Sequence, residues 1–153
     1  MKTLAIYAGS FNPFHIGHLN IVEKAERIFG KGNVLIAIGI NPGKVKPEEV
    51  GDITEKAIEL KNKINREVVV YTTFLHEFIE EKEKEGYKVI LVRGLRNGDD
   101  LAYENNQLKF IRDFKKGIDV VFIMSDDEYE HISSSSIKTL ELFRKGSAKK
   151  YLI

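Results

Sequence analysis

Short apolar runs alternate with segments of mixed polarity along the chain. The run at 33–40 has almost no polar interruption, which is typical of a strand covered on both faces of a sheet. Shorter runs of the same kind, bounded by turn residues, predict four more strands. We expect strands at 4–8, 33–40, 67–71, 88–92 and 119–124.

The segments between these runs carry apolar residues on a polar background and predict helices. The expected helices are 19–29, 52–65, 75–85, 99–116 and 134–144. Strands that alternate with helices at this spacing specify an α/β fold, a doubly wound parallel sheet with right-handed crossovers. We expect a single domain over residues 1–153, with five strands in the Rossmann-like order 3-2-1-4-5.

Charge and cysteine content narrow the possible functions. Lys and Arg total 24 and Asp and Glu total 23, so the chain has no general electrostatic attraction for nucleic acid or an anionic membrane. The absence of Cys excludes disulfides, Cys-ligated zinc, iron–sulfur clusters and thiol catalysis. The apolar run at 4–8 is too short for a signal-peptide core or a membrane span, so we expect a cytoplasmic protein.

The loop after the first strand is the strongest candidate for chemistry. It contains His15 and His18 with Gly17 between them, just before the first expected helix. Backbone N–H groups at a helix start lack helical partners, and the helix dipole adds partial positive charge, so such a loop can bind phosphate. Gly17 would leave room for a ligand to approach the backbone. The alternative is that the glycines only permit a tight turn.

Further polar residues follow other strands at the same edge of the sheet. Lys44 follows the second strand, Arg93 and Arg96 follow the fourth, and a serine run at 133–136 follows the fifth. Taken singly, these could be a solvated lysine, surface ion pairs and a helix N-cap. Together they predict an anion site, since arginine forks and helix-start hydroxyls suit phosphate oxygens. Phosphoryl-type transfer needs alignment and charge neutralisation rather than a nucleophile triad.

Several segments also resemble a known family. Residues 9–18, Gly-Ser-Phe-Asn-Pro-Phe-His-Ile-Gly-His, resemble the signature of nucleotidyltransferases. Arg-Gly-Leu-Arg at 93–96, Tyr103-Glu104, Ile-Ser-Ser-Ser at 132–135 and Lys138 narrow the resemblance to bacterial phosphopantetheine adenylyltransferases. That resemblance implies transfer of the adenylyl group of ATP to 4′-phosphopantetheine, giving dephospho-coenzyme A and pyrophosphate. It also implies Mg²⁺ as cofactor, no metal-ligating residues in the chain and a homo-oligomer, which is a hexamer in the family.

The resemblance assigns residues to both substrates. Ser10 and Lys44 would hold the phosphate of 4′-phosphopantetheine, with Arg93 and Leu75 also at that substrate. His18 would stabilise the transition state, and Lys44 and Arg96 would be catalytic with it. The residues expected around ATP are Ser10, Phe11, His15, His18, Gly94, Leu95, Arg96, Glu104, Tyr129, Ile132, Ser133, Ser134 and Ser135.

Two other functions stay open. The segment 12–15, Asn-Pro-Phe-His, is closer to nicotinamide-mononucleotide adenylyltransferases, which transfer the same group to another acceptor. A pocket for a pyridinium ring would need aromatic side chains, and the chain has no Trp. The third possibility is a nucleotide-binding sensor without catalysis, against which the complete set of histidines and cations argues.

Overall fold

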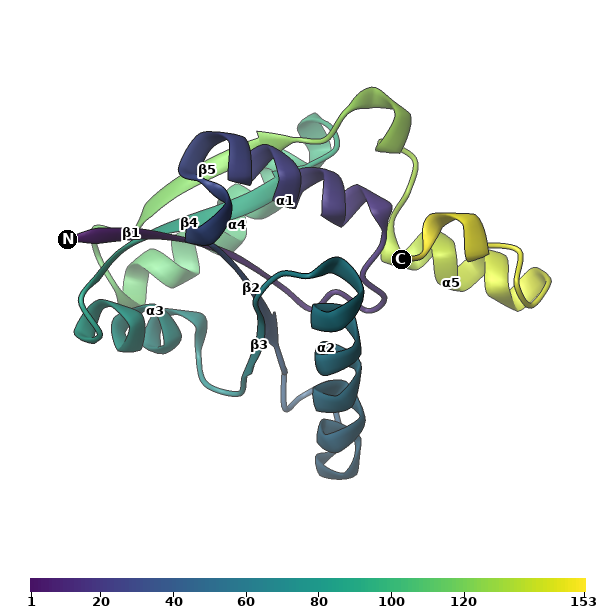
Figure 1. Ribbon diagram of the computed structural model, residues 1–153, viewed down its shortest axis with the longest axis horizontal. Coiled ribbons are helices and arrows are strands. Elements are labelled where there is room, and N and C mark those ends of the chain that lie inside the picture. The colour runs from purple at the N-terminus through teal and green to yellow at the C-terminus, as the bar shows by residue number, and fades with distance from the viewer.

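The computed structural model describes residues 1–153 and is built around one sheet (Figure 1). All neighbouring strands are parallel, and the order 3-2-1-4-5 confirms the prediction. The strands, in sheet order, are β3 (Val68–Tyr71), β2 (Val34–Gly39), β1 (Lys2–Gly9), β4 (Tyr87–Leu95) and β5 (Asp119–Met124).

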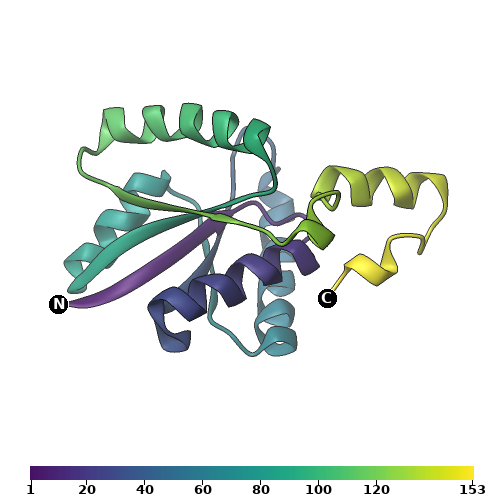
Figure 2. The same cartoon turned by 90° about the horizontal axis from the view of Figure 1, so that it is seen from above.

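Helices cover both faces of this sheet. They are α1 (Ile16–Phe29), α2 (Val50–Ile64), α3 (Leu75–Lys84), α4 (Gly98–Phe114) and α5 (Ser134–Phe143). One apolar core joins the sheet to α1 and α2, and a second core joins the other face to α3, with α4 packed against it. Figure 2 shows α1 and α4 on opposite sides of the strands.

The central strand supplies side chains to both cores. Ala5 and Tyr7 of β1 belong to the core beneath α1, whereas Ile6 and Ala8 belong to the core beneath α3. Successive residues of a strand point to opposite faces, so a strand buried on both sides reads as a continuous apolar run. This burial explains why the strand pattern of the sequence predicts the sheet.

Several element boundaries differ from the predicted ones. β4, expected at 88–92, runs to Leu95, so Arg93 lies within this strand rather than after it. β1 begins at Lys2, because Lys2 and Thr3 find ladder partners in β4. The helix expected from residue 19 begins at Ile16, because the preceding histidine caps it. The helix expected from residue 52 begins at Val50, directly after a 3-10 turn at Pro47–Glu49.

The C-terminal part of the chain lies to one side of the sheet (Figures 1 and 2). After α5 the chain turns back through a 3-10 turn at Lys149–Tyr151, and Leu152 forms an isolated antiparallel bridge with His15. A small third core of Ile132, Ile137 and Ala148 holds this part together. The return of the chain therefore places its last residues against the loop that precedes α1.

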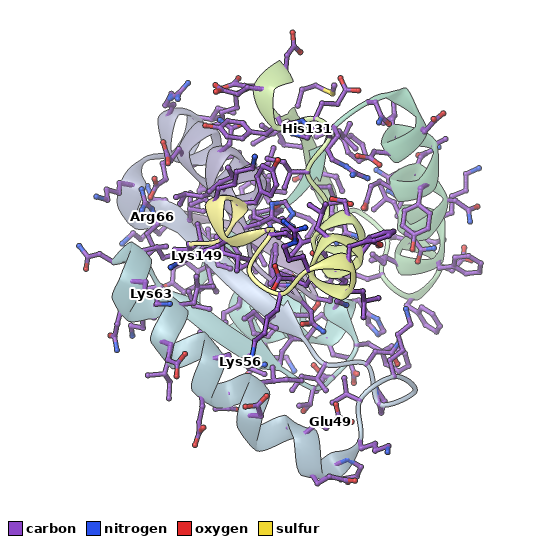
Figure 3. All side chains as sticks on the ribbon, turned by 90° about the vertical axis from the view of Figure 1, so that its right-hand side faces the viewer. Glu49, Lys56, Lys63, Arg66, His131 and Lys149 are labelled. Carbon is purple, nitrogen blue, oxygen red and sulfur yellow. The ribbon has the colours of Figure 1, made fainter.

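Both positively and negatively charged side chains lie on the outer surface. The face in Figure 3 carries α2 and α5, and its labelled residues Glu49, Lys56, Lys63 and Lys149 are exposed. None of the helices combines the length and apolar composition needed to cross a membrane.

Candidate active site

A cavity of about 460 Å³ opens at the carboxyl ends of β1, β4 and β5. The first turns of α1 and α5 also line it, so two helix N-termini face the same space. Open α/β sheets bind ligands at this edge, and helix N-termini favour anions. Most of the predicted site residues line this cavity: Ser10, Phe11, His15, His18, Arg93, Gly94, Leu95, Arg96, Glu104, Tyr129, Ile132, Ser133, Ser134 and Ser135.

Both histidines use one ring nitrogen to cap α1. The Nδ1 of His15 accepts a hydrogen bond from the backbone N–H of Gly17 at 3.1 Å. The Nδ1 of His18 accepts one from the backbone N–H of His15, also at 3.1 Å, and the two rings stack with centroids 3.7 Å apart. A nitrogen that accepts from an amide carries no proton, so each neutral ring bears its hydrogen on Nε2. The caps therefore set the tautomer of both rings.

The surroundings keep both imidazoles uncharged. Burial lowers the pKa of His15 to about 4, and the positive charge of Arg96 acts in the same direction. Burial also lowers the pKa of His18 well below its usual value, with further contributions from His15 and Arg96. Near neutral pH each ring can therefore offer an N–H donor to an anion without itself being a cation.

Gly17 has a different role from the one the sequence indicated. A Cβ atom built at this position would lie 2.9 Å from Cε1 and 3.0 Å from Nδ1 of His15. Real Cβ atoms do not approach other heavy atoms this closely, so the space beside Gly17 is filled by the His15 ring rather than kept for a ligand. The glycine allows the capping histidine to fold back onto the helix start.

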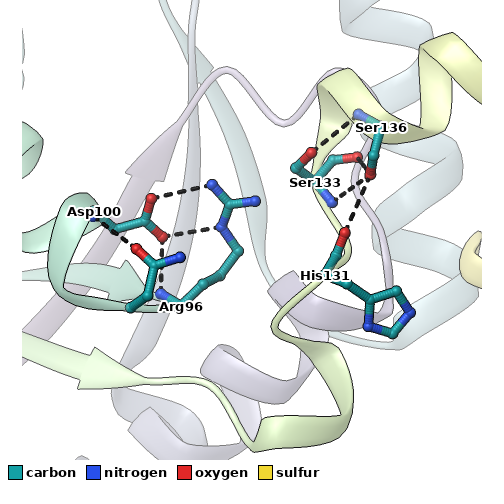
Figure 4. Close-up of polar contacts among 6 residues, drawn as sticks. Arg96, Asp100, His131, Ser133 and Ser136 are labelled. Carbon is teal, nitrogen blue, oxygen red and sulfur yellow. Dashed lines mark hydrogen bonds and ion pairs between the residues drawn. The ribbon is translucent and has the colours of Figure 1, made fainter.

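The two arginines of the cavity are held by carboxylates. Arg93 donates through Nε to Glu104 at 2.6 Å and through Nη1 to the carbonyl oxygen of Ala8 at 3.3 Å. Arg96 donates through Nε and Nη2 to the two oxygens of Asp100, at 2.9 and 3.0 Å (Figure 4). Each fork keeps one terminal nitrogen without a protein partner, so each can donate to a ligand from a fixed position.

Asp100 is itself fixed at the start of α4. Its Oδ2 accepts the backbone N–H of Arg96 at 2.8 Å, and its own N–H donates to the side chain of Asn97 at 3.0 Å (Figure 4). Burial raises the pKa of Asp100, but the contacts with Arg96 outweigh it and the net pKa is lowered. The carboxylate therefore remains charged and holds the guanidinium in place.

Most hydroxyls of the serine run are engaged within the protein. Ser133 and Ser136 cap the start of α5 reciprocally, each accepting the other's backbone N–H at 3.0 and 2.9 Å (Figure 4). Ser134 donates its hydroxyl to the carbonyl oxygen of Pro13 at 3.0 Å, which ties α5 to the loop before α1. As the first two helical residues, Ser134 and Ser135 have backbone N–H groups without helical partners, and these can face an anion.

Comparison with known proteins places this fold and site in a family. The cytidylyltransferase-like family model matches residues 6–140. The chain belongs to the cytidylyltransferase-like family. It is 33% identical over 144 residues to the phosphopantetheine adenylyltransferase of Clostridium botulinum (strain Langeland), covering 94% of this chain and 84% of that relative. It is also 33% identical over 149 residues to the phosphopantetheine adenylyltransferase of Mycoplasma mycoides, covering 95% of this chain and all of that relative.

Two predicted residues of this cytidylyltransferase-like protein lie outside the cavity. Lys44 is exposed on the loop after β2, where its backbone N–H donates to the carbonyl oxygen of Asn41 at 3.0 Å. Leu75 begins α3 and packs against the core beneath that helix. Neither side chain contributes to the cavity wall.

The cavity also contains residues that the sequence did not single out. Tyr7 is 5% exposed, and its hydroxyl oxygen lies 3.2 Å from where a Cβ on Gly94 would be, yet it has no hydrogen bond within the protein. Burial raises the pKa of Tyr7, so its hydroxyl is a neutral donor. Ser125 lines the cavity with a buried Oγ that also lacks a partner. The sequence does not predict Tyr7 as a cavity residue, because an aromatic residue in an apolar strand is equally typical of the core.

Proposed function

We propose that this chain transfers the adenylyl group of ATP to 4′-phosphopantetheine, giving dephospho-coenzyme A and pyrophosphate. The observation that carries the proposal is the pair of neutral histidines, capped at Nδ1, at a cavity that two helix N-termini share. The names of the curated relatives supply the acceptor. Residues 1–153 would act as one nucleotidyltransferase domain.

In the proposed reaction, an oxygen of the acceptor phosphate attacks the α-phosphorus of ATP. A new P–O bond forms while the bond from the α-phosphorus to the bridging oxygen of the β-phosphate breaks, and pyrophosphate leaves with that electron pair. The backbone N–H groups of Ser134 and Ser135 would bind triphosphate oxygens at the start of α5. The Nε2–H of His18 and the unpaired nitrogen of Arg96 would donate to oxygens whose charge grows in the transition state.

The acceptor would bind on the side of the cavity near β1. Ser10 is exposed at the end of that strand, and Arg93 is fixed beside it by Glu104 and Ala8. Lys44 would join this group only if its long side chain reached across from the loop after β2. Leu75, which would contact the pantetheine chain, would likewise have to meet it at the rim rather than inside the cavity.

Magnesium is proposed to arrive with ATP. No group of three or more His, Asp or Glu side chains in residues 1–153 is arranged to hold a metal ion. Oxygen ligands from the triphosphate and water are the usual partners of Mg²⁺ in such sites. The bound ion would neutralise phosphate charge, and a requirement for added Mg²⁺ after chelation would test this proposal.

The decisive experiment is product analysis with purified protein, ATP and Mg²⁺. The acceptors to compare are 4′-phosphopantetheine and nicotinamide mononucleotide, with pyrophosphate release and adenylylated product measured for each. We expect a clear preference for 4′-phosphopantetheine in kcat/KM. A preference for the mononucleotide would replace the acceptor but keep the adenylyl transfer, and ATP binding without turnover on either would favour a sensor.

We also propose that the protein is a homo-oligomer. Phe74 and Phe114 are 63% and 64% exposed, and they stack with His76 in an aromatic patch between α3 and α4. Exposed aromatic patches commonly mark protein interfaces. Sedimentation velocity should show that Phe114→Ser lowers the assembly state, whereas Ile58→Ser, at a 57% exposed residue of α2 outside this patch, leaves it unchanged. The cytoplasm is the proposed compartment, which cell fractionation would test.

A further inference from the structure

A polar cluster outside the cavity wall joins α1 to the chain after β5. The side-chain amide of Asn20 donates to Oδ2 of Asp126 at 2.9 Å, and the backbone N–H of Asp126 donates back to Oδ1 of Asn20 at 2.9 Å. Lys24, one turn further along α1, contacts Oδ1 of Asp126 at 2.6 Å and the carbonyl oxygen of Met124 at 2.7 Å. These four contacts connect parts of the chain that are about a hundred residues apart in sequence.

The residues of this cluster lie close in the chain to cavity residues of α1 and to cavity residues after β5. Asn20 lies two residues after His18 on α1, and Asp126 directly follows Ser125 and precedes the segment 129–135 that lines the nucleotide side. Figures 1 and 2 show α1 running beside β5. That strand ends at Met124, whose carbonyl oxygen Lys24 contacts, and Asp126 follows two residues later. The residues at both ends of the cluster are thus within one helical turn or a short loop of cavity residues.

We infer that Asn20, Lys24 and Asp126 are positioning residues that hold the His18 donor in register with the phosphate-binding start of α5. This inference rests on the proposed adenylyl transfer and adds residues that do not touch substrate. Alignment of a donor with a phosphate is sensitive to displacements of about 1 Å, which can change a rate by roughly a hundredfold. Contacts that limit movement between α1 and the segment leading to α5 would therefore protect the rate of such a reaction.

The chemistry of the cluster favours positioning over simple packing. Asn20 is only 8% exposed, a place where an apolar residue would stabilise the helix contact without needing a partner. The reciprocal pair instead accepts one geometry only, since both the donor and the acceptor of the amide must be satisfied. The hydrogen bonds from Lys24 and Asn20 lower the pKa of Asp126, so the carboxylate is charged near neutral pH.

An exchange of the two side chains provides the test. Asn20→Asp places a carboxylate where the amide donates, 2.9 Å from an oxygen of Asp126, so the two charges repel. Asp126→Asn is the matched control, because an amide there can keep both hydrogen bonds with Asn20, and Lys24 keeps its contact with the carbonyl oxygen of Met124. The control loses only the partly exposed ion pair with Lys24, whereas Lys24→Met loses both contacts of that side chain. The double variant Asn20→Asp with Asp126→Asn restores the donor, the acceptor and the net charge with the two residues exchanged.

The expected results concern ATP more than the acceptor. Asn20→Asp should raise the Kd for ATP, measured by calorimetry without acceptor, by about tenfold and lower kcat by at least as much, which corresponds to about 1.4 kcal/mol. The KM for 4′-phosphopantetheine should change by less than about threefold. The double variant should return to within about threefold of Asp126→Asn in both Kd and kcat.

Two results would overturn the inference. One is a folded Asn20→Asp protein with wild-type ATP affinity and turnover, and the other is a double variant no better than Asn20→Asp. If Asn20→Asp does not fold, Lys24→Met replaces it, since this partly exposed side chain makes two of the contacts; an unchanged Kd and kcat there would also overturn the inference. If wild-type protein fails to adenylylate 4′-phosphopantetheine, the proposed function fails, while the ATP Kd series still decides the positioning role.

Discussion

Replacing Gly17 by Ala tests the link between the cap of α1 and catalysis. The added methyl would lie 2.9 Å from Cε1 of His15, and that ring is 4% exposed and stacked on His18. The methyl cannot fit beside the ring in its present position, so the variant must shift the ring, towards the cavity that it lines, or the start of the helix. Either change breaks the hydrogen bond from the Gly17 N–H to His15 Nδ1.

The size of the effect follows from three contributions. Forcing a methyl group into the packed contact between Gly17 and His15 costs about 1–3 kcal/mol. Loss of a side-chain N-cap costs about 1 kcal/mol. Ala in place of Gly within a helix returns about 0.5–1 kcal/mol. We expect a net destabilisation of about 1–3.5 kcal/mol, which lowers Tm by roughly 3–10 °C in a chain of this length. Displacement of His18 should lower kcat by about ten- to a hundredfold.

Gly51 provides the matched control. It is the second residue of α2 as Gly17 is of α1, and a Cβ built there meets nothing within 4 Å. Gly51→Ala should therefore raise Tm slightly and leave turnover unchanged. Thermal unfolding and pyrophosphate release would be measured for both variants. If Gly17→Ala were as stable and as active as Gly51→Ala, the proposed contact between the His15 ring and the helix start would be refuted.

The remaining predictions concern pH and single side chains. Because His15 has a pKa of about 4 in the folded protein, its stabilising contribution is complete above pH 6.5 and is lost as pH falls towards 4; urea midpoints should show this, with a flatter profile for His15→Asn. Tyr7→Phe removes a hydroxyl without a protein partner, so stability should stay within about 0.5 kcal/mol while kcat/KM falls, and an unchanged kcat/KM would exclude a ligand contact. Lys44→Ala should leave the Kd for ATP unchanged within about twofold, because Lys44 lies outside the cavity; a raised KM for 4′-phosphopantetheine alone would place Lys44 at the acceptor.

The sheet could be predicted from the sequence because its central strands are buried on both faces. Ala5, Ile6, Leu91 and Val92 are fully buried, and such residues occur in unbroken apolar runs that few other structures require. The start of α1 could not be predicted in the same way. Usual N-caps are Ser, Thr, Asp and Asn, so a histidine that caps through Nδ1 gives no recognised signal and the helix was expected to begin three residues late.

For the cavity residues, too, the sequence predicts some features and only the packing determines others. Arg93 and Arg96 were recognisable as cations at the right sheet edge, but their pairing with Glu104 and Asp100 depends on where α4 begins and how it packs. Tyr7 pairs with Val92 of β4, and its hydroxyl lies close to Gly94 two residues further along, an arrangement that only the assembled sheet reveals. Sequence position therefore indicates which residues reach the edge, while packing decides which of their atoms remain available.

The histidines show how closely availability and structure are connected at this site. Each ring gives Nδ1 to the backbone of the helix start and thereby keeps its proton on Nε2, so the same hydrogen bonds that stabilise α1 determine the donor. Burial lowers the pKa of both rings, which reduces the stability of the protein in acid. Across neutral pH, however, both rings keep the same neutral protonation state and remain donors. Loss of His18 would remove a helix cap and a donor together. A drop in rate on its removal thus includes a structural part, and the Gly17 variant shows how much of that drop arises from displacement and loss of a cap while both imidazoles are kept.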